Sequence, residues 1–351
     1  MAPGPLIDPP VDPPVEQRAE AVAQRIDQVR ALLHEEGSPG VLLSSRAAFA
    51  WLTLGGQNHV VAASADGAVP LLVTPTGCYA LAAANEAPRI ADEELAGLPV
   101  DVMTVPWHEP DAVAREERRI CGGEPITEAG LGNALVDLRL RLGAVEQERL
   151  RWLGALAGRV MGQSLEAVTH GSTEDHLAAR VHAALAAEGV RLPVILVAAD
   201  ERIERYRHPL PQGRRIERRV MLVVVGERWG LHAAATRILD LEPPSTELLQ
   251  RMEATEGVLT AMRAATVPGR TLDDVLSAAR AAYSAAGFHD EWTLHHQGGL
   301  IGYQGRERIA TPGDATRIDA GMAVAWNPSI TGAKAEATDL VGDSGLEVIL
   351  E

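Results

Sequence analysis

The sequence contains few aromatic residues, two cysteines and no long apolar run. Aromatic side chains make up 3% of its 351 residues, and alanine dominates the apolar ones, so we expect helices packed by small side chains. Cys78 and Cys121 do not have the spacing of a metal site. Two isolated cysteines fit a reduced cytoplasmic protein better than a disulfide-bonded one. No apolar run approaches the roughly 20 residues that span a bilayer.

Positive charge is also scarce. The chain has 32 Lys and Arg residues against 48 Asp and Glu residues, which gives a formal net charge of −16. This balance argues against nucleic acid or an anionic membrane as a partner, because both require a basic surface. Residues 1–6 lack the basic region and the apolar stretch of a signal peptide. We therefore expect a cytoplasmic protein with no nucleic-acid and no membrane partner.

The length of the chain predicts two domains, because it exceeds what one ordinary core holds. Residues 1–16 are rich in proline and acidic residues, which predicts a disordered tail. Residues 17–143 form the first predicted domain, of mixed α/β type, and residues 144–351 form the second. No glycine-rich phosphate loop follows a predicted strand of the first domain, so nucleotide binding has no support.

The periodicity of apolar residues predicts the elements of both domains. In the first domain it predicts helices over 16–36, near 79–85 and from 110, and strands over 40–43, 60–63, 69–73 and 100–105. In the second it predicts helices over 145–170, 174–188, 245–265 and 272–286, and strands over 194–198, 220–226 and 231–239. Ser172 or Thr173 is the expected N-cap of the helix that starts at 174.

The stretch around His208 organises the second domain. An X-Pro pair on each side of Leu210 keeps the segment Arg205–Pro211 extended, so this loop presents His208. The valine-rich run over 220–226 favours a strand that is covered on both faces. A hairpin turn over 226–230 then returns the chain as the next strand.

Several motifs of the second domain occur in a fixed order. They are Arg207-His208-Pro209, Thr236-Arg237, His295-His296-Gln297-Gly298-Gly299, Asn327-Pro328 and Glu336-Ala337-Thr338. With this order and spacing the chain resembles the creatinase/aminopeptidase P (M24, pita-bread) superfamily. The segments 25–33, 40–43 and 51–56 are similar to its creatinase-type N-terminal domain. The resemblance implies an α/β fold, with that domain followed by a pita-bread domain.

The metal-binding positions that the resemblance implies are mostly changed. Peptidases of this superfamily bind two metal ions through two aspartates, a histidine and two glutamates. The matching positions here are Val223–Val225, Ala234, Gly299, Asn327 and Glu336. One carboxylate beside valine, alanine and glycine cannot hold a dinuclear centre, which needs several ligand atoms. We therefore predict no metal, no other cofactor and no metal-dependent peptidase activity.

The same resemblance offers a metal-free precedent, because creatinase hydrolyses creatine through a loop histidine and glutamates. His208 and Glu336 match that histidine and one of those glutamates. A neutral-range imidazole suits proton transfer, and a nearby carboxylate is expected to raise its pKa. The leading prediction is therefore a C–N hydrolase or lyase for a small amino-acid-derived or short-peptide substrate. The alternatives are a non-catalytic module that binds a peptide, as in histone-chaperone relatives, and residual Xaa-Pro aminopeptidase or dipeptidase activity.

The predicted catalytic residues are His208, Glu336 and His295. Glu336 is expected to hold a cationic group or position a water, or else to be a buried partner for Arg237 or Lys334. His295 and its neighbour His296 form a possible proton relay, although adjacent strand residues point to opposite faces. The alternative is that both histidines form hydrogen bonds with backbone groups. Metal binding by these two has no third ligand nearby in the sequence.

The predicted substrate contacts share the region of these motifs and are Asn327, His296, Gln297, Arg207, Arg237, Tyr303 and His232. Asn327 replaces a charged ligand by an amide that donates and accepts hydrogen bonds, or is a plain turn residue. Arg207 is expected to clamp a carboxylate with Arg205, or to be solvated. Gln297, Arg306 and Glu307 can equally be scaffold or rim residues.

Two further expectations concern volume and assembly. Trp229 and His232 flank the hairpin that lacks the aspartates, so they are expected to fill the volume left by the metals. The resemblance also implies a homodimer. The turn that matches 56–59 approaches the partner's pocket in creatinase-like dimers, so a composite site and a plain surface turn are both open interpretations.

Overall fold

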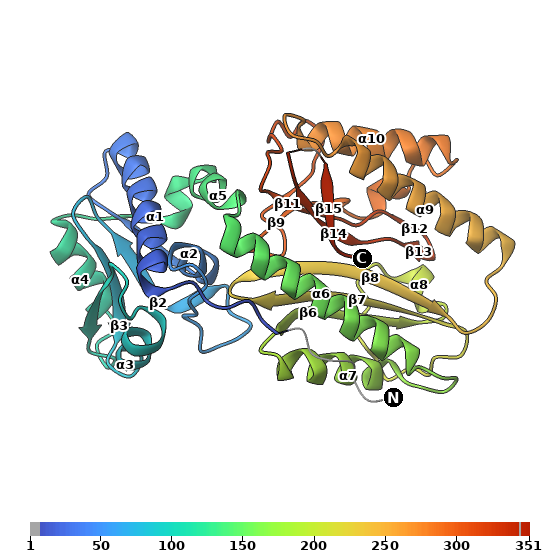
Figure 1. Ribbon diagram of the computed structural model, residues 1–351, viewed down its shortest axis with the longest axis horizontal. Coiled ribbons are helices and arrows are strands. Elements are labelled where there is room, and N and C mark those ends of the chain that lie inside the picture. Colours follow the sequence, from blue (N-terminus) through green and yellow to red (C-terminus); the bar gives the residue numbers. More distant parts are fainter. Residues whose placement is uncertain (1–7, 344) are drawn as a thin grey trace. The chain divides into compact units, whose positions relative to one another are not determined.

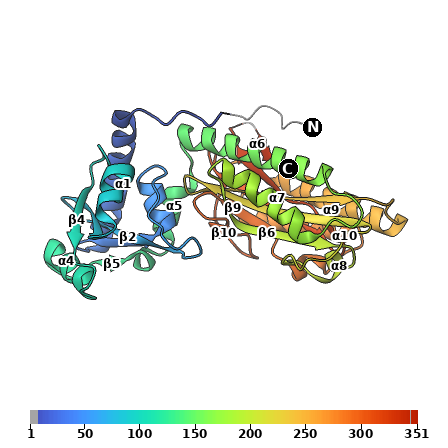
Figure 2. The same ribbon diagram turned by 90° about the horizontal axis from the view of Figure 1, so that it is seen from below.

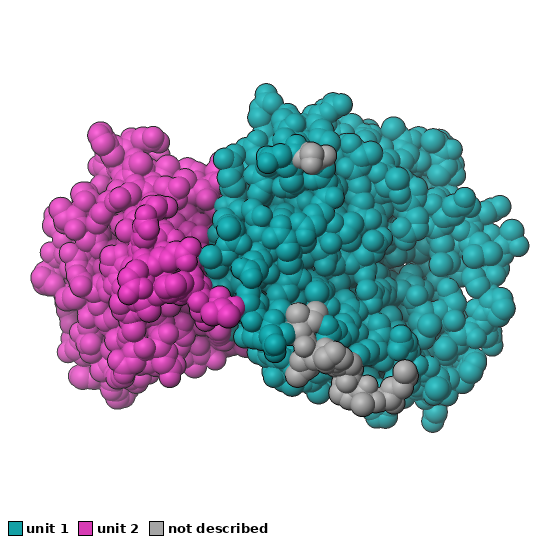
Figure 3. All heavy atoms as spheres, viewed as in Figure 1, with its two compact units in different colours: residues 1–10, 140–351 teal, residues 11–139 magenta. Residues whose placement is uncertain are grey.

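The chain forms two compact units. A computed structural model describes residues 8–343 and 345–351 (Figure 1). One unit is Val11–Arg139 and the other contains Leu140–Glu351, as the two colours of Figure 3 show. Of the predicted tail, residues 1–7 lie outside the described residues, and Val15 already begins the first helix. In the described part of the chain, no helix is both long and apolar enough to cross a membrane.

The N-terminal unit is built on a five-stranded sheet with the order β4-β3-β2-β1-β5. Its strands are β1 Val41–Ser45, β2 Asp66–Val73, β3 Cys78–Ala83, β4 Asp101–Val105 and β5 Ile126–Thr127. Its helical segments are α1 Val15–Glu36, α2 Arg46–Leu52, α3 Ala87–Arg89, η1 Ile90–Glu94, α4 Ala112–Cys121, η2 Glu128–Leu131 and α5 Asn133–Leu140. Helix α1 buries Val22, Ile26, Val29 and Leu33, which have the spacing of one helix face. The predicted helix over 16–36 is confirmed.

Two predictions for this unit are wrong. Residues 79–85 do not form a helix, because Cys78–Ala83 pairs with β2 on one side and β4 on the other. The sheet thus overrides the helix propensity of the alanines. Residues 60–63 form a turn rather than a strand, and Val60 and Val61 are 65% and 63% exposed, with no sheet to cover them. Cys78 and Cys121 are both free, as predicted.

The first half of the C-terminal unit packs two helices on a three-stranded sheet. The helices are α6 Ala144–Glu166 and α7 Glu174–Ala187, and the sheet has the order β6-β7-β8. The strands are β6 Arg191–Ala199, β7 Arg219–Arg228 and β8 Leu231–Asp240, and α8 Arg202–Arg205 follows β6. Both helices lie along one face of this sheet (Figure 1, Figure 2). Thr173 caps α7, because its side chain accepts from the backbone N–H of His176.

The second half of the unit carries two packed helices, α9 Thr246–Ala265 and α10 Leu272–Ala285. Its main sheet has the order β10-β9-β11-β14-β15, and β12 pairs with β13. These elements are η3 Glu291–Leu294, β9 Gly298–Ile301, β10 Arg308–Ile309, β11 Ala323–Trp326, β12 Ser329–Ile330, β13 Ala333–Lys334, β14 Ala337–Val341 and β15 Leu346–Leu350. Strand β8 contacts β11, β13, β14 and β15, which brings the two halves of the unit together.

Candidate functional site

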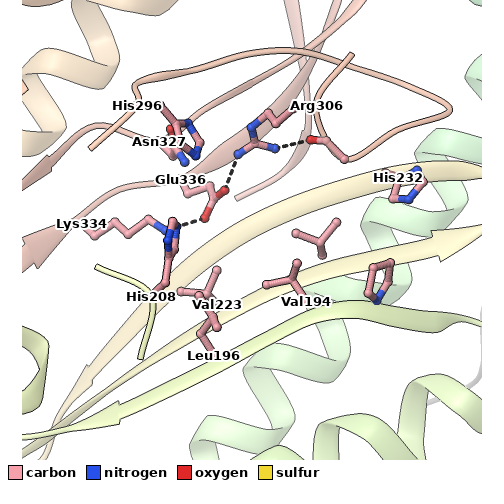
Figure 4. Close-up of a pocket in the computed structure, with 13 residues that line it drawn as sticks. Val194, Leu196, His208, Val223, His232, His296, Arg306, Asn327, Lys334 and Glu336 are labelled. Atoms are coloured by element: carbon pink, nitrogen blue, oxygen red, sulfur yellow. Dashed lines mark hydrogen bonds and ion pairs between the residues drawn. The ribbon is translucent and has the colours of Figure 1, made fainter. Parts of the chain in front are cut away.

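The C-terminal unit contains a cavity of about 320 Å³ between its two halves (Figure 4). The residues that line it come from β6, β7 and β8 on one side and from the segments after α8 and η3 on the other. They are Pro193, Val194, Leu196, His208, Val223, Val225, His232, His296, Gly305, Arg306, Asn327, Lys334 and Glu336. The β6 and β7 residues of the lining are therefore apolar, whereas β8 contributes the imidazole of His232 and the other side carries the charges and further imidazoles.

The apolar wall follows from strand pairing. Val223 and Val225 lie two residues apart on β7, so they point to the same face of the sheet. In the adjacent strand β6, Leu196 pairs with Val223 and Val194 pairs with Val225. The four side chains therefore form one patch, and the β-branched run that the sequence shows is what makes this wall.

Glu336 is the charged centre of the opposite wall. Its side chain is 2% exposed and meets two cations, because Lys334 Nζ lies 3.1 Å from Oε2 and Arg306 Nη2 lies 2.8 Å from Oε1. The hydroxyl of Thr236 also donates to Oε2 at 2.6 Å. Burial alone would raise the pKa of Glu336, but Lys334, Arg306 and Thr236 together lower it to about 2. The carboxylate is therefore ionised, and both of its oxygens have partners.

Two polar atoms of this wall lack a partner. Arg306 donates through Nη1 to the carbonyl of Gly305, but its Nε is buried and has no hydrogen-bond partner among the described residues. The same holds for Oδ1 of Asn327, whose backbone N–H donates to the carbonyl of Gln297. A buried polar atom without a partner is unfavourable by about 1–3 kcal/mol. Such a donor and such an acceptor are suited to a bound molecule.

Three histidines gather at the mouth of the cavity. The Nε2 atoms of His208 and His295 lie 3.0 Å apart, and the rings of His295 and His296 stack at 4.3 Å between centroids. Burial lowers the pKa of His295 to about 3 and that of His296 to about 4; Lys334 adds to both shifts, and Arg306 adds to that of His296. All three imidazoles are thus neutral at pH 7, since the pKa of His208 is lowered as well.

The expected rise in the pKa of His208 is therefore wrong. Burial is the main cause of its lowered pKa, and Lys334 acts in the same direction. Glu336 acts in the opposite direction, as expected, but Arg306 also lowers the pKa. Glu336 does not raise the pKa of His208 overall, because Lys334 and Arg306 flank it and their combined positive charge exceeds its negative charge.

The same three histidines also offer a set of metal ligands. One ring nitrogen from each of His208, His295 and His296 lies within 4.8 Å of the other two. A third ligand for His295 and His296 was not expected, because His208 is far away along the chain. The fold supplies it, so that expectation is corrected.

Comparison with known proteins assigns the family. The sequence model of metallopeptidase family M24 matches residues 148–347. This chain belongs to metallopeptidase family M24. The probable dipeptidase PepE of Mycobacterium tuberculosis is 26% identical over 220 residues, which cover 59% of this chain and 58% of that protein. This M24 chain thus matches less than two thirds of the length of that relative.

Solved structures confirm the α/β pita-bread fold. The prolidase from Pyrococcus horikoshii OT3 superposes with a TM-score of 0.77 at 16% identity, over 93% of this chain and 98% of that one. The N-terminal domain of the FACT complex subunit SPT16 from chickpea (Cicer arietinum) has a TM-score of 0.72 at 12% identity, over 95% of each chain. At such identities the likeness concerns the fold alone.

The residues at the M24 metal positions do not fit two metal ions. Val223 and Val225 belong to the apolar patch, and Ala234, which pairs with Val225, has no ligand atom. A side chain at Gly299 is blocked, because a Cβ there would lie 2.0 Å from the backbone oxygen of Arg308. The one remaining carboxylate, Glu336, already binds two cations. These side chains offer neither the oxygen atoms nor the space for the pair.

Four predicted substrate contacts lie away from the cavity lining. Arg237 donates to the carbonyls of Gly158 and Glu351, because Thr236 takes the cavity face of β8 and its neighbour must take the other. Tyr303 is buried, and its hydroxyl donates to Glu146 at 2.6 Å. These two side chains hold the C-terminal strand and the start of α6.

The other two of these four stabilise the loops behind the site. Arg207 forms an ion pair with Glu291 at 2.7 Å and contacts Thr331. Gln297 is 1% exposed and accepts a hydrogen bond from the hydroxyl of Tyr283 at 2.8 Å. Both therefore position the segments that carry His208 and His295, rather than a ligand.

Most of the remaining predicted residues lie at the cavity. His208, His232, His296, Asn327 and Glu336 line the cavity, and His295 meets it through His208. Trp229 does not fill the metal volume, because it packs against Trp152 at the hairpin turn, where Arg228 and Arg149 lie over its ring. The turn over 56–59 belongs to the other unit, so its approach to a partner's pocket stays a prediction.

The expected alternative role of Glu336, a buried partner for Arg237 or Lys334, is confirmed for Lys334 and wrong for Arg237. Lys334 precedes Glu336 by two residues, so an extended backbone places both side chains on one face. Arg306, expected only among scaffold or rim residues, lines the cavity as the second cation beside Glu336. Arg306 comes from the loop between β9 and β10. Nothing local marks it, because its approach to Glu336 depends on the folded sheet.

Proposed function

We propose that this M24 protein is an enzyme that works without the two metal ions of its family. It acts on a C–N bond of a small amino-acid-derived or peptide-like substrate, as a hydrolase or a lyase, through acid–base chemistry. The observation that carries the proposal is that Lys334 and Arg306 meet Glu336 at the metal-binding wall. Two fixed side-chain charges therefore neutralise the one carboxylate that remains at the M24 metal positions.

The charges of the cavity favour a substrate with one negative charge. Lys334 and Arg306 contribute two positive charges and Glu336 one negative charge, while His208 and His296 have lowered pKa values and are neutral. The surplus of one positive charge matches a single carboxylate or a developing oxyanion. Nε of Arg306 is an unused donor for it, and Oδ1 of Asn327 is an unused acceptor for an N–H group. The valine and leucine patch suits an apolar side chain.

The histidine pair supplies the proton transfer. In the hydrolase case, neutral His208 takes a proton from a water molecule, whose oxygen attacks the carbon of the C–N bond. Lys334 and Arg306 stabilise the negative charge that develops on the substrate. The protonated His208 then gives its proton to the leaving nitrogen as the C–N bond breaks. In the lyase case, His208 takes the proton from a carbon next to the C–N bond instead. A C=C bond then forms as the C–N bond breaks, and the leaving nitrogen takes the proton from His208. His295 orients His208 through the 3.0 Å contact.

The test is turnover in the presence of a chelator. A panel of dipeptides, ureido acids and guanidino acids is incubated with the chelator-treated protein, and ammonia or amine release is measured. We expect at least one compound to be turned over, and H208A to reduce kcat by about 100-fold or more. H289A is the matched control, since His289 is exposed on another loop. Turnover that disappears with the chelator and returns with manganese contradicts the proposal.

A non-catalytic binding role is the second candidate. The observation in its favour is that Glu336, the carboxylate of the cavity lining, is engaged by three partners and is not available as a base. The resemblance in fold to the SPT16 domain supports the same idea. Binding of a carboxylate ligand that H208A leaves intact, with no turnover of any panel compound, favours this role over the enzyme.

Residual Xaa-Pro dipeptidase activity is the third candidate, and the names of the relatives favour it. The chemistry of the metal positions argues against it. We expect no cleavage of Xaa-Pro dipeptides with added manganese, measured by release of proline. Assembly as a homodimer and a cytoplasmic location also remain predictions.

A further inference from the structure

The three histidines at the cavity mouth form a second kind of site. His208 comes from the loop after α8, whereas His295 and His296 precede β9. One ring nitrogen of each lies within 4.8 Å of the others. His295 is buried, and its Nδ1 has no hydrogen-bond partner in the described part of the chain. The cluster lies beside the M24 metal positions, but it uses none of the residues at those positions.

We infer that His208, His295 and His296 together bind one zinc-like transition-metal ion, and that this ion inhibits the enzyme. The binding half of the inference stands on the geometry alone. The inhibition half rests on the proposed function, because the ion would occupy the ring nitrogens that carry out proton transfer.

The geometry suits three imidazole ligands. Two nitrogens bound to a tetrahedral zinc ion at the usual distances lie about 3.3 Å apart. The Nε2 atoms of His208 and His295 already lie 3.0 Å apart. One ring nitrogen of His296 lies within 4.8 Å of the other two ligand atoms, so His296 must move toward them by roughly 1–2 Å to complete the set. A tetrahedral ion held by three imidazoles keeps a fourth position for a water or an anion.

Binding changes the hydrogen bond between the first two histidines. In the neutral pair one Nε2 carries a hydrogen that the other accepts. Coordination through both Nε2 atoms moves that hydrogen to Nδ1 of the same ring, so each imidazole stays neutral and no proton is released. His208 then has no lone pair with which to accept a proton from a substrate.

The charges around the cluster set the strength and selectivity of binding. Lys334 and Arg306 repel a cation, and Glu336 attracts it. We therefore expect an affinity in the micromolar range, weaker than that of a structural zinc site. Three nitrogen ligands favour zinc, cobalt and nickel over magnesium and calcium, which prefer oxygen.

The test is a cobalt titration of chelator-treated protein that carries no histidine tag. Tetrahedral cobalt gives intense visible absorption, so binding is read without any activity assay. We expect one ion per chain, displaced by zinc and not by magnesium. H295A and H296A should each weaken binding by at least about 100-fold. H208A is the safer variant for folding, because His208 is exposed on its loop.

Two control variants separate this site from general histidine binding. H232A removes an imidazole that lines the same cavity but lies outside the cluster, and H289A removes an exposed one. Both should keep the cobalt spectrum. No saturable binding, or a spectrum that survives H208A and H296A, overturns the inference. Zinc that binds at the cluster without slowing a measured turnover overturns only the inhibition half.

Discussion

Two buried carboxylates of the C-terminal unit behave in opposite ways, although they lie three residues apart. Asp339 on β14 is 0% exposed, and both its oxygens accept from Arg263, at 2.9 Å each. Glu336, just before β14, meets Lys334 and Arg306. Burial raises the pKa of Asp339 despite its arginine, whereas the pKa of Glu336 is lowered to about 2.

The difference lies in the number of cations that each carboxylate meets. Arg263 is shared between Asp339 and Glu351, so Asp339 receives less than one full positive charge. Glu336 receives two, with a hydroxyl in addition. A buried acid that pairs with a single arginine is typical of a structural ion pair, and burial still determines the direction of its pKa shift. A surplus of positive charge in a cavity is consistent with the proposed binding of an anion.

The largest expected effect comes from E336Q. It leaves Lys334 and Arg306 buried without a countercharge, so we expect the free energy of unfolding to fall by about 3–5 kcal/mol. Urea denaturation measures the loss. The double variant K334M/E336Q removes one of the two cations and should recover part of the stability. A single variant as stable as the wild type would mean that the ion pairs contribute nothing.

The pH dependence of stability should distinguish the two acids. The folded pKa of Glu336, about 2, lies below its ordinary value of 4.5, so its contribution is present above pH 4.5 and is lost as the pH falls. Between pH 6 and 3 the loss is about 2 kcal/mol. The stability difference between wild type and E336Q should shrink by this amount. The raised pKa of Asp339 has the opposite sign, so the difference between wild type and D339N should not shrink.

D339N at neutral pH should have a smaller effect than E336Q. Arg263 is 21% exposed and keeps its contact with Glu351 at 3.3 Å, so it is not left buried without a partner. We expect a loss of about 2 kcal/mol in the free energy of unfolding. Ligand binding in the cavity should be unchanged. Equal losses for D339N and E336Q would contradict the distinction between the two acids.

The smallest effect is expected for T236V. It removes one hydrogen bond to Glu336 and keeps the shape of the side chain, so stability should fall by about 1 kcal/mol. The pKa of Glu336 should rise while staying below its ordinary value, as carboxyl NMR can measure. T338V is the control, because Thr338 bonds the backbone of Ala234 and not Glu336.

The sequence was sufficient to predict the fold, and it was also sufficient to predict those cavity residues that belong to the motifs of the superfamily. His208 and Glu336 could be located because each belongs to a short motif whose order identifies the superfamily. Strand alternation could also have excluded Arg237, since Thr236 already points to Glu336. The helix predicted over 79–85 failed for a different reason, because pairing inside a sheet is decided by distant strands.

The electrostatics of the site could not be read from the sequence. Whether Glu336 raises the pKa of His208 depends on Arg306, and the loop that carries Arg306 reaches Glu336 only after β9 and β10 have paired. The third imidazole of the histidine cluster comes from a segment separated from His295 by 87 residues. Such contacts between distant segments have no local signal.

The close approach of Arg308 to Gly299 constrains any attempt to build a dinuclear centre into this cavity. Aspartates can be introduced at Val223 and Ala234 by exchanging side chains alone, but a histidine at position 299 would meet the main chain of β10. A complete M24 ligand set therefore requires β10 to shift as well, so redesign of this protein must begin with the backbone and not with the ligands.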